Sequence, residues 1–365
     1  MTTQTRPPAA RWWTARKKAV GGVGLLTLLL IALETGTDGF VFGLILATLP
    51  VPVYVAVALW LDRFEAEPRR LLANAFFWGA AGAVFISMLV NTVFELSLAG
   101  SLGADRASLA GAVISAPVVE ELTKALVLFV FFFRHRDEFD NVTDGIVYAA
   151  MVGLGFAMTE NVLYYGNALA EGTEGSIGTF VIRGVMSPFA HPFFTAMTGI
   201  GLGIARETRR RPVQVLAPLA GLAAAMLIHS LWNLAASLDV FFPVYFLVMV
   251  PVFLGLILLI RHSLRREGRM IRAQLVPFVE TGVIAAAELD HICTVRGRLR
   301  ASAAAFRQGG VRAWRRHGEL SQAASELAFH RWRVERGISR GAEMDARCEG
   351  ELVSRIGALR EPGGG

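Results

Sequence analysis

Long apolar segments dominate the chain between residues 19 and 260 and are separated by short polar loops. A helix needs about 20 apolar residues to cross the hydrocarbon core of a bilayer. The sequence therefore predicts an all-α fold, a polytopic transmembrane helical bundle of about eight spans. The expected spans lie near residues 19–33, 40–61, 71–98, 107–133, 145–168, 179–205, 214–236 and 241–260.

The composition agrees with a membrane protein that carries a soluble tail. Only 18% of the residues are charged and 54% are hydrophobic, whereas a soluble protein carries about 25% charged residues. Arg and Glu become frequent after residue 261. We therefore expect an N-terminal cytoplasmic segment over 1–18, a transmembrane domain over 19–261 and a cytoplasmic helical tail over 262–365. The basic N-terminus followed by an apolar stretch is interpreted as a retained first span, because more spans follow it.

Basic residues in the loops indicate how the chain crosses the membrane. Every second loop carries a cluster of arginines or lysines, while the loops between them contain Arg106 as their only basic residue. The positive-inside rule places the basic loops, and with them both termini, in the cytoplasm. The net charge of +6 is thus explained by topology, and no nucleic-acid partner is expected.

Ionisable and amide side chains interrupt four of the expected spans. Charged groups in hydrocarbon cost a few kcal/mol each, so they usually face a protein interior or a cavity. At the helical rise of 1.5 Å per residue, four of these side chains lie roughly 21–27 Å from the cytoplasmic loops and so share one depth. They are Glu120, Glu160, His191 and His229. The sequence therefore predicts one polar site between the fourth and seventh spans, beyond the midplane. The residues are Glu120, Glu121, Lys124, Glu160, Asn161, Arg183, His191, His229 and Asn233.

Simpler interpretations exist for some of these residues. Glu120 and Lys124 are four residues apart on one helix face and can be explained as a buried structural ion pair, but Glu121 has no such obvious partner. Arg183 lies near the outer boundary, where it can extend to the lipid headgroups. Two adjacent carboxylates in a medium of low dielectric raise each other's proton affinity, which suits one of them to general base catalysis.

The motifs around these residues resemble the PrsW family of intramembrane proteases, related to the CAAX-processing endopeptidases. They are E-E-x-x-K at Glu120–Lys124, the segment Asp144–Asn161 that ends in E-N, R-x7-H-P at Arg183–Pro192 and H-S-L-W-N at His229–Asn233. The segment around Asp62–Pro68 also looks like the family's first cytoplasmic loop. The resemblance covers roughly residues 50–240 and implies a multi-pass enzyme of a bacterial plasma membrane that cleaves a membrane-anchored protein, such as an anti-sigma factor.

The resemblance also implies roles for the site residues. Glu120 and Glu121 would be the catalytic glutamates, and Glu160, His191 and His229 the other polar residues of the site. In a metal-free mechanism, His229 with Asn233 would stabilise the oxyanion. A divalent metal, with zinc preferred, would be held by Glu160, His191 and His229, because a catalytic zinc needs about three protein ligands. Lys124, Asn161 and Arg183 would complete the site. The zincin motif H-E-x-x-H is absent, so a metal-free mechanism with a glutamate and a histidine stays open.

Two other functions compete with a protease. A proton-coupled transporter would use buried Glu, His and Lys as a proton relay, and a catalytically silent scaffold would only bind. Many transporters carry internal repeats of broken spans, and neither E-E-x-x-K nor H-x-x-x-N is repeated in this chain. The tail is expected to form helical stretches near 264–305, 311–336 and 342–359, folded as a hairpin, with a basic amphipathic pattern typical of a partner-binding or membrane-surface segment.

Overall fold

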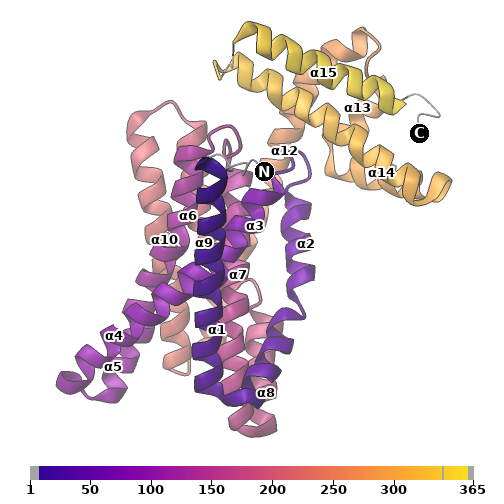
Figure 1. The fold of residues 1–365 in the computed structure, drawn as a ribbon. Coiled ribbons are helices and arrows are strands. Elements are labelled where there is room, and N and C mark those ends of the chain that lie inside the picture. The colour runs from indigo at the N-terminus through magenta and orange to yellow at the C-terminus, as the bar shows by residue number, and fades with distance from the viewer. Residues whose placement is uncertain (1–7, 339–340, 361–365) are drawn as a thin grey trace, which may run out of the picture. The chain divides into compact units, whose positions relative to one another are not determined.

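The computed structural model describes residues 8–338 and 341–360, with side chains from Val20 onward, and every regular element in them is a helix (Figure 1). Two compact units are present. The first runs through Leu61 and resumes over Glu67–Phe253, and the second combines Asp62–Ala66 with Leu254–Gly365. The expected division into a membrane domain over 19–261 and a cytoplasmic tail stays a prediction, since compactness does not place a membrane. Part of the expected N-terminal segment, residues 1–7, lies outside the described residues.

The first unit is a helical membrane bundle, as predicted. In chain order its helices are α1 (Pro8–Thr48), α2 (Val51–Leu61), α3 (Arg69–Phe77), η1 (Trp78–Ala83), α4 (Val84–Leu102), α5 (Ala104–Ala110), η2 (Gly111–Ser115), α6 (Ala116–Arg134), α7 (Val142–Ala170), α8 (Gly172–Phe180), η3 (Val181–Met186), α9 (Ala190–Glu207), α10 (Arg211–Ser237), α11 (Phe241–Val244), η4 (Tyr245–Met249) and the first turn of α12 (Val250–Glu280).

Five helical stretches among the described residues are long and apolar enough to cross a membrane: Val20–Leu61, Arg69–Leu102, Val142–Ala170, Arg211–Ser237 and Phe241–Glu280. The first is 42 residues long and contains both of the first two expected spans, divided at Gly36, where φ is 71° and ψ is 170°. The expected spans 107–133 and 179–205 are helical but are not among the five. The first of them carries Glu120, Glu121 and Lys124, so the count of eight stays a prediction.

Helix α7 lies in the interior of the first unit and positions the neighbouring helices. It begins with a capping box, in which the side chain of Asn141 accepts from the amide of Asp144 and the carboxylate of Asp144 accepts from the amide of Asn141. Glycines then allow close approach of the backbones, as small residues do in membrane helices. A Cβ added at Gly153 would lie 2.5 Å from the nitrogen of Pro192, so this glycine fixes the distance between α7 and the start of α9.

Four π-helical segments occur among the described residues, and two of them lead into helices that carry site residues. Segment η2 precedes α6, and η3 ends at the non-helical Ser187 shortly before α9. A π turn leaves part of the i→i−4 ladder open, and such turns occur frequently at functional sites. Tyr54 and Tyr245 donate to the carbonyls of Gly184 and Met186, at 3.2 and 2.8 Å, and so hold η3 in place.

The second unit contains α12 from Leu254 onward, with α13 (Ala286–Cys293), α14 (Val295–Glu335) and α15 (Ala342–Arg360). Helix α14 bends at Gly309 and Gly310, and its two arms fold back on each other. Contacts of Arg298 in the first arm show this: its Nη2 donates to the carbonyl of Ser321 at 3.4 Å and to the hydroxyl of Ser325. The predicted helical hairpin is thus confirmed. The loop residue Phe64 also belongs to this core and lies 4.6 Å below the guanidinium of Arg298, a contact that the sequence did not reveal.

Candidate active site

Helix α6 supplies two carboxylates and an ammonium group that are all buried. Glu121 and Lys124 are fully inaccessible, and Glu120 is 6% exposed. The Nζ atom of Lys124 lies 2.9 Å from Glu121 and 3.2 Å from Glu120. It also lies 3.7 Å from the centre of the Phe156 ring, a cation–π contact. The expected ion pair therefore exists, but it joins one cation to both glutamates, so a purely pairwise structural role does not account for it.

His229 on α10 connects to both glutamates through its two ring nitrogens. Its Nδ1 lies 3.1 Å from Oε1 of Glu121, and its Nε2 lies 4.0 Å from Oε2 of Glu120. The ring stacks on Phe194 at 4.7 Å between centroids. Because Glu121 accepts a hydrogen bond from Nδ1–H, the tautomer that this network favours leaves Nε2 with its lone pair facing Glu120.

His191 on α9 is also held through both of its ring nitrogens. Its Nδ1 lies 3.0 Å from Nζ of Lys124, which donates, and its Nε2 lies 2.9 Å from Oε2 of Glu160 on α7. Glu160 in turn pairs with Arg183, whose Nε donates to the side chain of Asn161 at 2.7 Å. Arg183 is thus part of the site's hydrogen-bond network, and the alternative of extension to the headgroups does not describe its contacts.

Asn233 lies one turn after His229 but bonds to a neighbouring helix. Its Nδ2 donates to the carbonyl of Ala112 in η2 at 2.8 Å. This bond joins α10 to the segment that leads into α6, so it positions the helices that carry His229 and Glu120. The amide expected to assist catalysis directly is engaged in a helix-to-helix contact in this structure.

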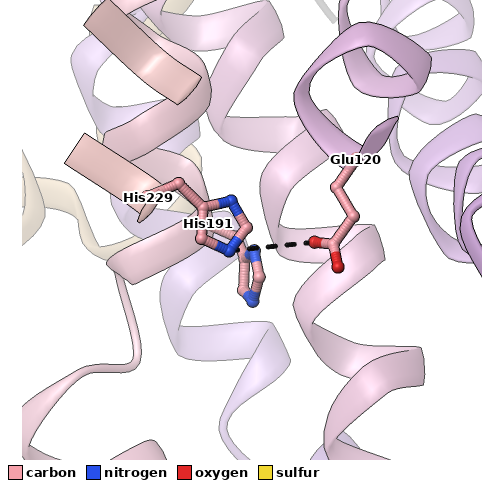
Figure 2. A group of neighbouring side chains, drawn as sticks. All are labelled: Glu120, His191 and His229. Atoms are coloured by element: carbon pink, nitrogen blue, oxygen red, sulfur yellow. Dashed lines mark ion pairs between the residues drawn. The ribbon is translucent and has the colours of Figure 1, made fainter. Parts of the chain in front are cut away.

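Within the described part of the chain, the side chains grouped closely enough to hold a metal ion are Glu120, His191 and His229 (Figure 2). One ligand atom from each lies within 4.8 Å of the others, and all three residues are buried. The expected set contained Glu160 in place of Glu120. Glu160 instead contacts Arg183 and the outer nitrogen of His191, which places it behind the histidine rather than among the three grouped donors.

The donor set fits a divalent metal by its chemistry. Two imidazoles and one carboxylate form a known catalytic zinc set, and each histidine here has a carboxylate on one ring nitrogen, Glu160 for His191 and Glu121 for His229. A metal bound to Nδ1 of His191 would replace the hydrogen bond that this nitrogen accepts from Lys124. Such carboxylate partners orient metal-binding histidines and raise their basicity. The cluster of Glu120, Glu121, Glu160, Lys124 and Arg183 also has one more carboxylate than permanent cations, a charge that a metal ion or a proton would balance.

Three residues that contact the site were not predicted. Thr195 donates to Oε2 of Glu121 at 3.0 Å, Phe194 stacks on His229, and Phe156 packs against both Lys124 and His191. Thr195 is four residues after His191 in an apolar helix, a spacing that places both on one face. That periodicity could have identified Thr195, whereas nothing in the sequence distinguishes these phenylalanines from others in the spans.

Sequence comparison decides the family. The model of the PrsW family, described as intramembrane metalloproteases, matches residues 67–256, which is just over half of the chain and includes every site residue described above. The chain belongs to the PrsW family. It is therefore an integral membrane protein, in agreement with the apolar helices of the first unit.

Individual PrsW proteins are similar over a shorter stretch. The chain is 37% identical over 145 residues to Protease PrsW of Geobacillus kaustophilus, which is 40% of this chain and 58% of that protein. It is 31% identical over 145 residues to Protease PrsW of Bacillus subtilis, covering 40% and 60%. For Protease PrsW of Halalkalibacterium halodurans the identity is 33% over 139 residues, covering 38% and 58%. The chain thus spans less than two thirds of these relatives, and no solved structure matches it significantly.

Proposed function

We propose that this chain is an intramembrane endopeptidase that hydrolyses a peptide bond of a membrane-anchored protein. The observation that carries the proposal is the buried cluster of Glu120, His191 and His229, with a carboxylate behind each histidine. Peptide hydrolysis inside a membrane needs a held water, a base and donors for the developing oxyanion. Family membership agrees with this chemistry.

In the metal-free mechanism, Glu120 is the residue that we assign to accept the proton of the attacking water. Both oxygens of Glu121 already accept hydrogen bonds, from Lys124, His229 and Thr195, so Glu121 serves to orient His229. The 4.0 Å between Glu120 and Nε2 of His229 suits one water molecule in hydrogen-bond contact with both. Glu120 then returns the proton to the leaving amine, which completes general acid–base catalysis.

Lys124 supplies positive charge where the substrate carbonyl develops negative charge. Its ammonium is completely buried, and a fixed cation in a site of low dielectric stabilises an oxyanion more than it would in water. In the metal-dependent alternative, a divalent metal, with zinc the best match to the donors, would be held by Glu120, His191 and His229, and Glu120 would act as a ligand instead of as the base. When bound, the metal would polarise the carbonyl and lower the pKa of a bound water.

The substrate that we propose is a single-span protein of the same membrane, and an anti-sigma factor is the particular candidate that the family resemblance suggests. We also propose that both termini of this chain lie in the cytoplasm of a bacterium, with the chain in the plasma membrane. The alternation of basic and non-basic loops supports this topology.

The proposal is tested by co-reconstitution with candidate single-span proteins. We expect cleavage by the wild type and a loss of at least about 10²-fold in the variants Glu120→Ala, Glu121→Ala and His229→Ala, the scale of removing an acid–base group. Glu174→Ala is the matched control, because this carboxylate is exposed in α8 and its removal leaves cleavage unchanged. Unaltered cleavage in all three site variants would end the protease assignment.

A further inference from the structure

The hairpin of α14 ends in a tip that extends beyond the helical core of the second unit. Its arms, residues 295–308 and 311–335, meet at Gly309 and Gly310, where Gly310 has φ 63°. Arg298 ties the arms together at Ser321 and Ser325. At 1.5 Å per residue, the bend lies roughly 16 Å beyond Arg298. We call residues 299–315 the hairpin tip.

Large apolar side chains are exposed on this tip. Phe306 and Val311 are each 53% accessible, Leu299 is 51% and Trp314 is 48%. Three of these, Phe306, Val311 and Trp314, line one open cleft beside the bend. Single exposed apolar residues are ordinary on protein surfaces, but a grouped set of this kind indicates an interaction site.

The charge around the apolar cleft has a single sign. Between His291 and Gly318 there is no Asp or Glu, while seven arginines occur at 296, 298, 300, 307, 312, 315 and 316. Five of them are exposed: Arg296, Arg300, Arg307, Arg312 and Arg315. Ion pairs of the second unit between at least partly accessible side chains, such as Arg331 with Glu349 and Arg355 with Glu326, lie outside the tip. The exposed arginines of the tip can therefore reach an external anion.

We propose that the hairpin tip docks on the anionic lipid surface of a bilayer. Phe306, Val311 and Trp314 would enter the interface, and the arginines would pair with lipid headgroups. An apolar face flanked by basic residues binds such surfaces through burial and charge together. The chain is an integral membrane protein, and the apolar helical stretch Phe241–Glu280 continues directly into the second unit, so a bilayer is always present at high effective concentration. Charge complementarity and this tethering select a lipid surface as the occupant.

The test places an environment-sensitive fluorophore on the tip of the full chain in nanodiscs. The label is attached to Val311→Cys in a Cys348→Ser background, since Cys293 is 3% exposed. Discs contain phosphatidylcholine alone or equal parts of phosphatidylcholine and phosphatidylglycerol, each with a fraction of lipids that quench the fluorophore. We expect strong quenching in the anionic discs, weak quenching in neutral discs, and release of the tip by high salt.

Variants separate lipid binding from other roles of the tip. Neutralising Arg307, Arg312 and Arg315 together to Gln weakens docking on the order of 10²-fold, at about fivefold for each basic residue near an anionic surface. Replacing the same three by Lys keeps the charge and restores docking. The matched control is Met344→Ser with Arg347→Gln, an exposed apolar residue and an exposed arginine of α15, which leaves quenching unchanged.

Three results would overturn the proposal. Equal quenching in neutral and anionic discs would remove the role of the arginines. Absence of quenching in both would show that the tip does not reach lipid. Shielding of the label in detergent that increases with protein concentration would assign the tip to a second copy of the chain. Helical content, measured by circular dichroism, identifies any variant whose tail has unfolded, and the Lys variant then carries the comparison.

Discussion

The Nδ1 atom of His229 lies 3.1 Å from Oε1 of Glu121, a carboxylate with no solvent exposure. This contact fixes both the orientation of the imidazole and the nitrogen that carries its proton. It assigns different tasks to two adjacent glutamates, since Glu120 faces the other nitrogen of His229. The two carboxylates that the sequence presents as a pair therefore act from opposite sides of one histidine.

Substituting Glu121 by Gln tests this division of tasks. Gln cannot supply a charged acceptor for Nδ1–H of His229, so the ring is held less firmly and is less basic. We expect zinc affinity to fall about 10–100-fold, the usual effect of removing the partner of a ligating histidine. Competitive titration with a chelating dye measures it. An affinity equal to that of the wild type would show that Glu121 does not act through His229.

Metal content distinguishes the donor set of the structure from the one expected from the sequence. We expect purified wild type to bind a divalent metal, and the variants Glu120→Gln, His191→Ala and His229→Ala to lose it. Glu160→Gln keeps a weakened site, because Glu160 lies behind His191. Mass spectrometry of the metal in dialysed protein is the measurement. Loss of metal in Glu160→Gln with retention in Glu120→Gln would reverse the assignment.

Lys124 is the cation that both glutamates of α6 contact. Replacing it by Met leaves Glu120 and Glu121 buried without that charge, and breaking a buried ion pair from one side costs about 3–5 kcal/mol. We expect the Lys124→Met variant to have a lower melting temperature than the wild type when both are measured with chelator. Added zinc should restore part of the difference. Arg134→Met, an exposed site on the same helix, is the control. An unchanged melting temperature would contradict a charge-balancing role for Lys124.

Gly153 determines how closely α9 approaches α7. A Cβ at this position would lie 2.5 Å from the nitrogen of Pro192 and 2.7 Å from the carbonyl carbon of His191. We expect Gly153→Val to displace His191 and reduce cleavage by about 10²-fold, the scale for a misplacement of about 1 Å. Gly178→Val is the control, because a Cβ added there would meet nothing within 4 Å. Full activity of the Gly153 variant would show that α9 can move without loss.

Cys293 lies in the core of the second unit, where burial raises the pKa of its thiol to about 11. The thiolate is the reactive form, so we expect Cys293 to resist alkylation at neutral pH and to react as the pH approaches 11. Because the pKa in the folded state is above its ordinary value of 9.0, the stability contributed by this thiol is lost as the pH rises from about 9 through about 11. Labelling at one site only, Cys348, is the expected result of mass spectrometry near pH 7. Rapid labelling of Cys293 would contradict its burial.

The convergence of four spans was predictable because charged groups in hydrocarbon must face each other or a cavity. The rise per residue then places Glu120, Glu160, His191 and His229 at one depth. Which of them lie close enough to hold a metal together was not predictable. Small changes in helix rotation decide this, and so does the position of Arg183, which pairs with Glu160.

The structure of the tail was partly predictable for a similar reason. The paired glycines at 309 and 310 and the apolar stripe that follows predicted a hairpin, and Arg298 closes it. The contribution of Phe64 to the same core was not visible, because it lies more than 200 residues before Arg298 and belongs to a short loop. Long-range contacts of this kind carry no local periodicity.

The position of the cut in a substrate tests the central claim most directly. A single-span protein that the wild type cleaves in nanodiscs is analysed by mass spectrometry, in parallel with the His229→Ala variant. We expect fragments from a peptide bond within the spanning segment in the wild type alone, because the buried cluster of Glu120, His191 and His229 lies within the helices of the membrane bundle. A cut confined to a soluble part of the substrate, or the same fragments from His229→Ala, would contradict an intramembrane active site at this cluster.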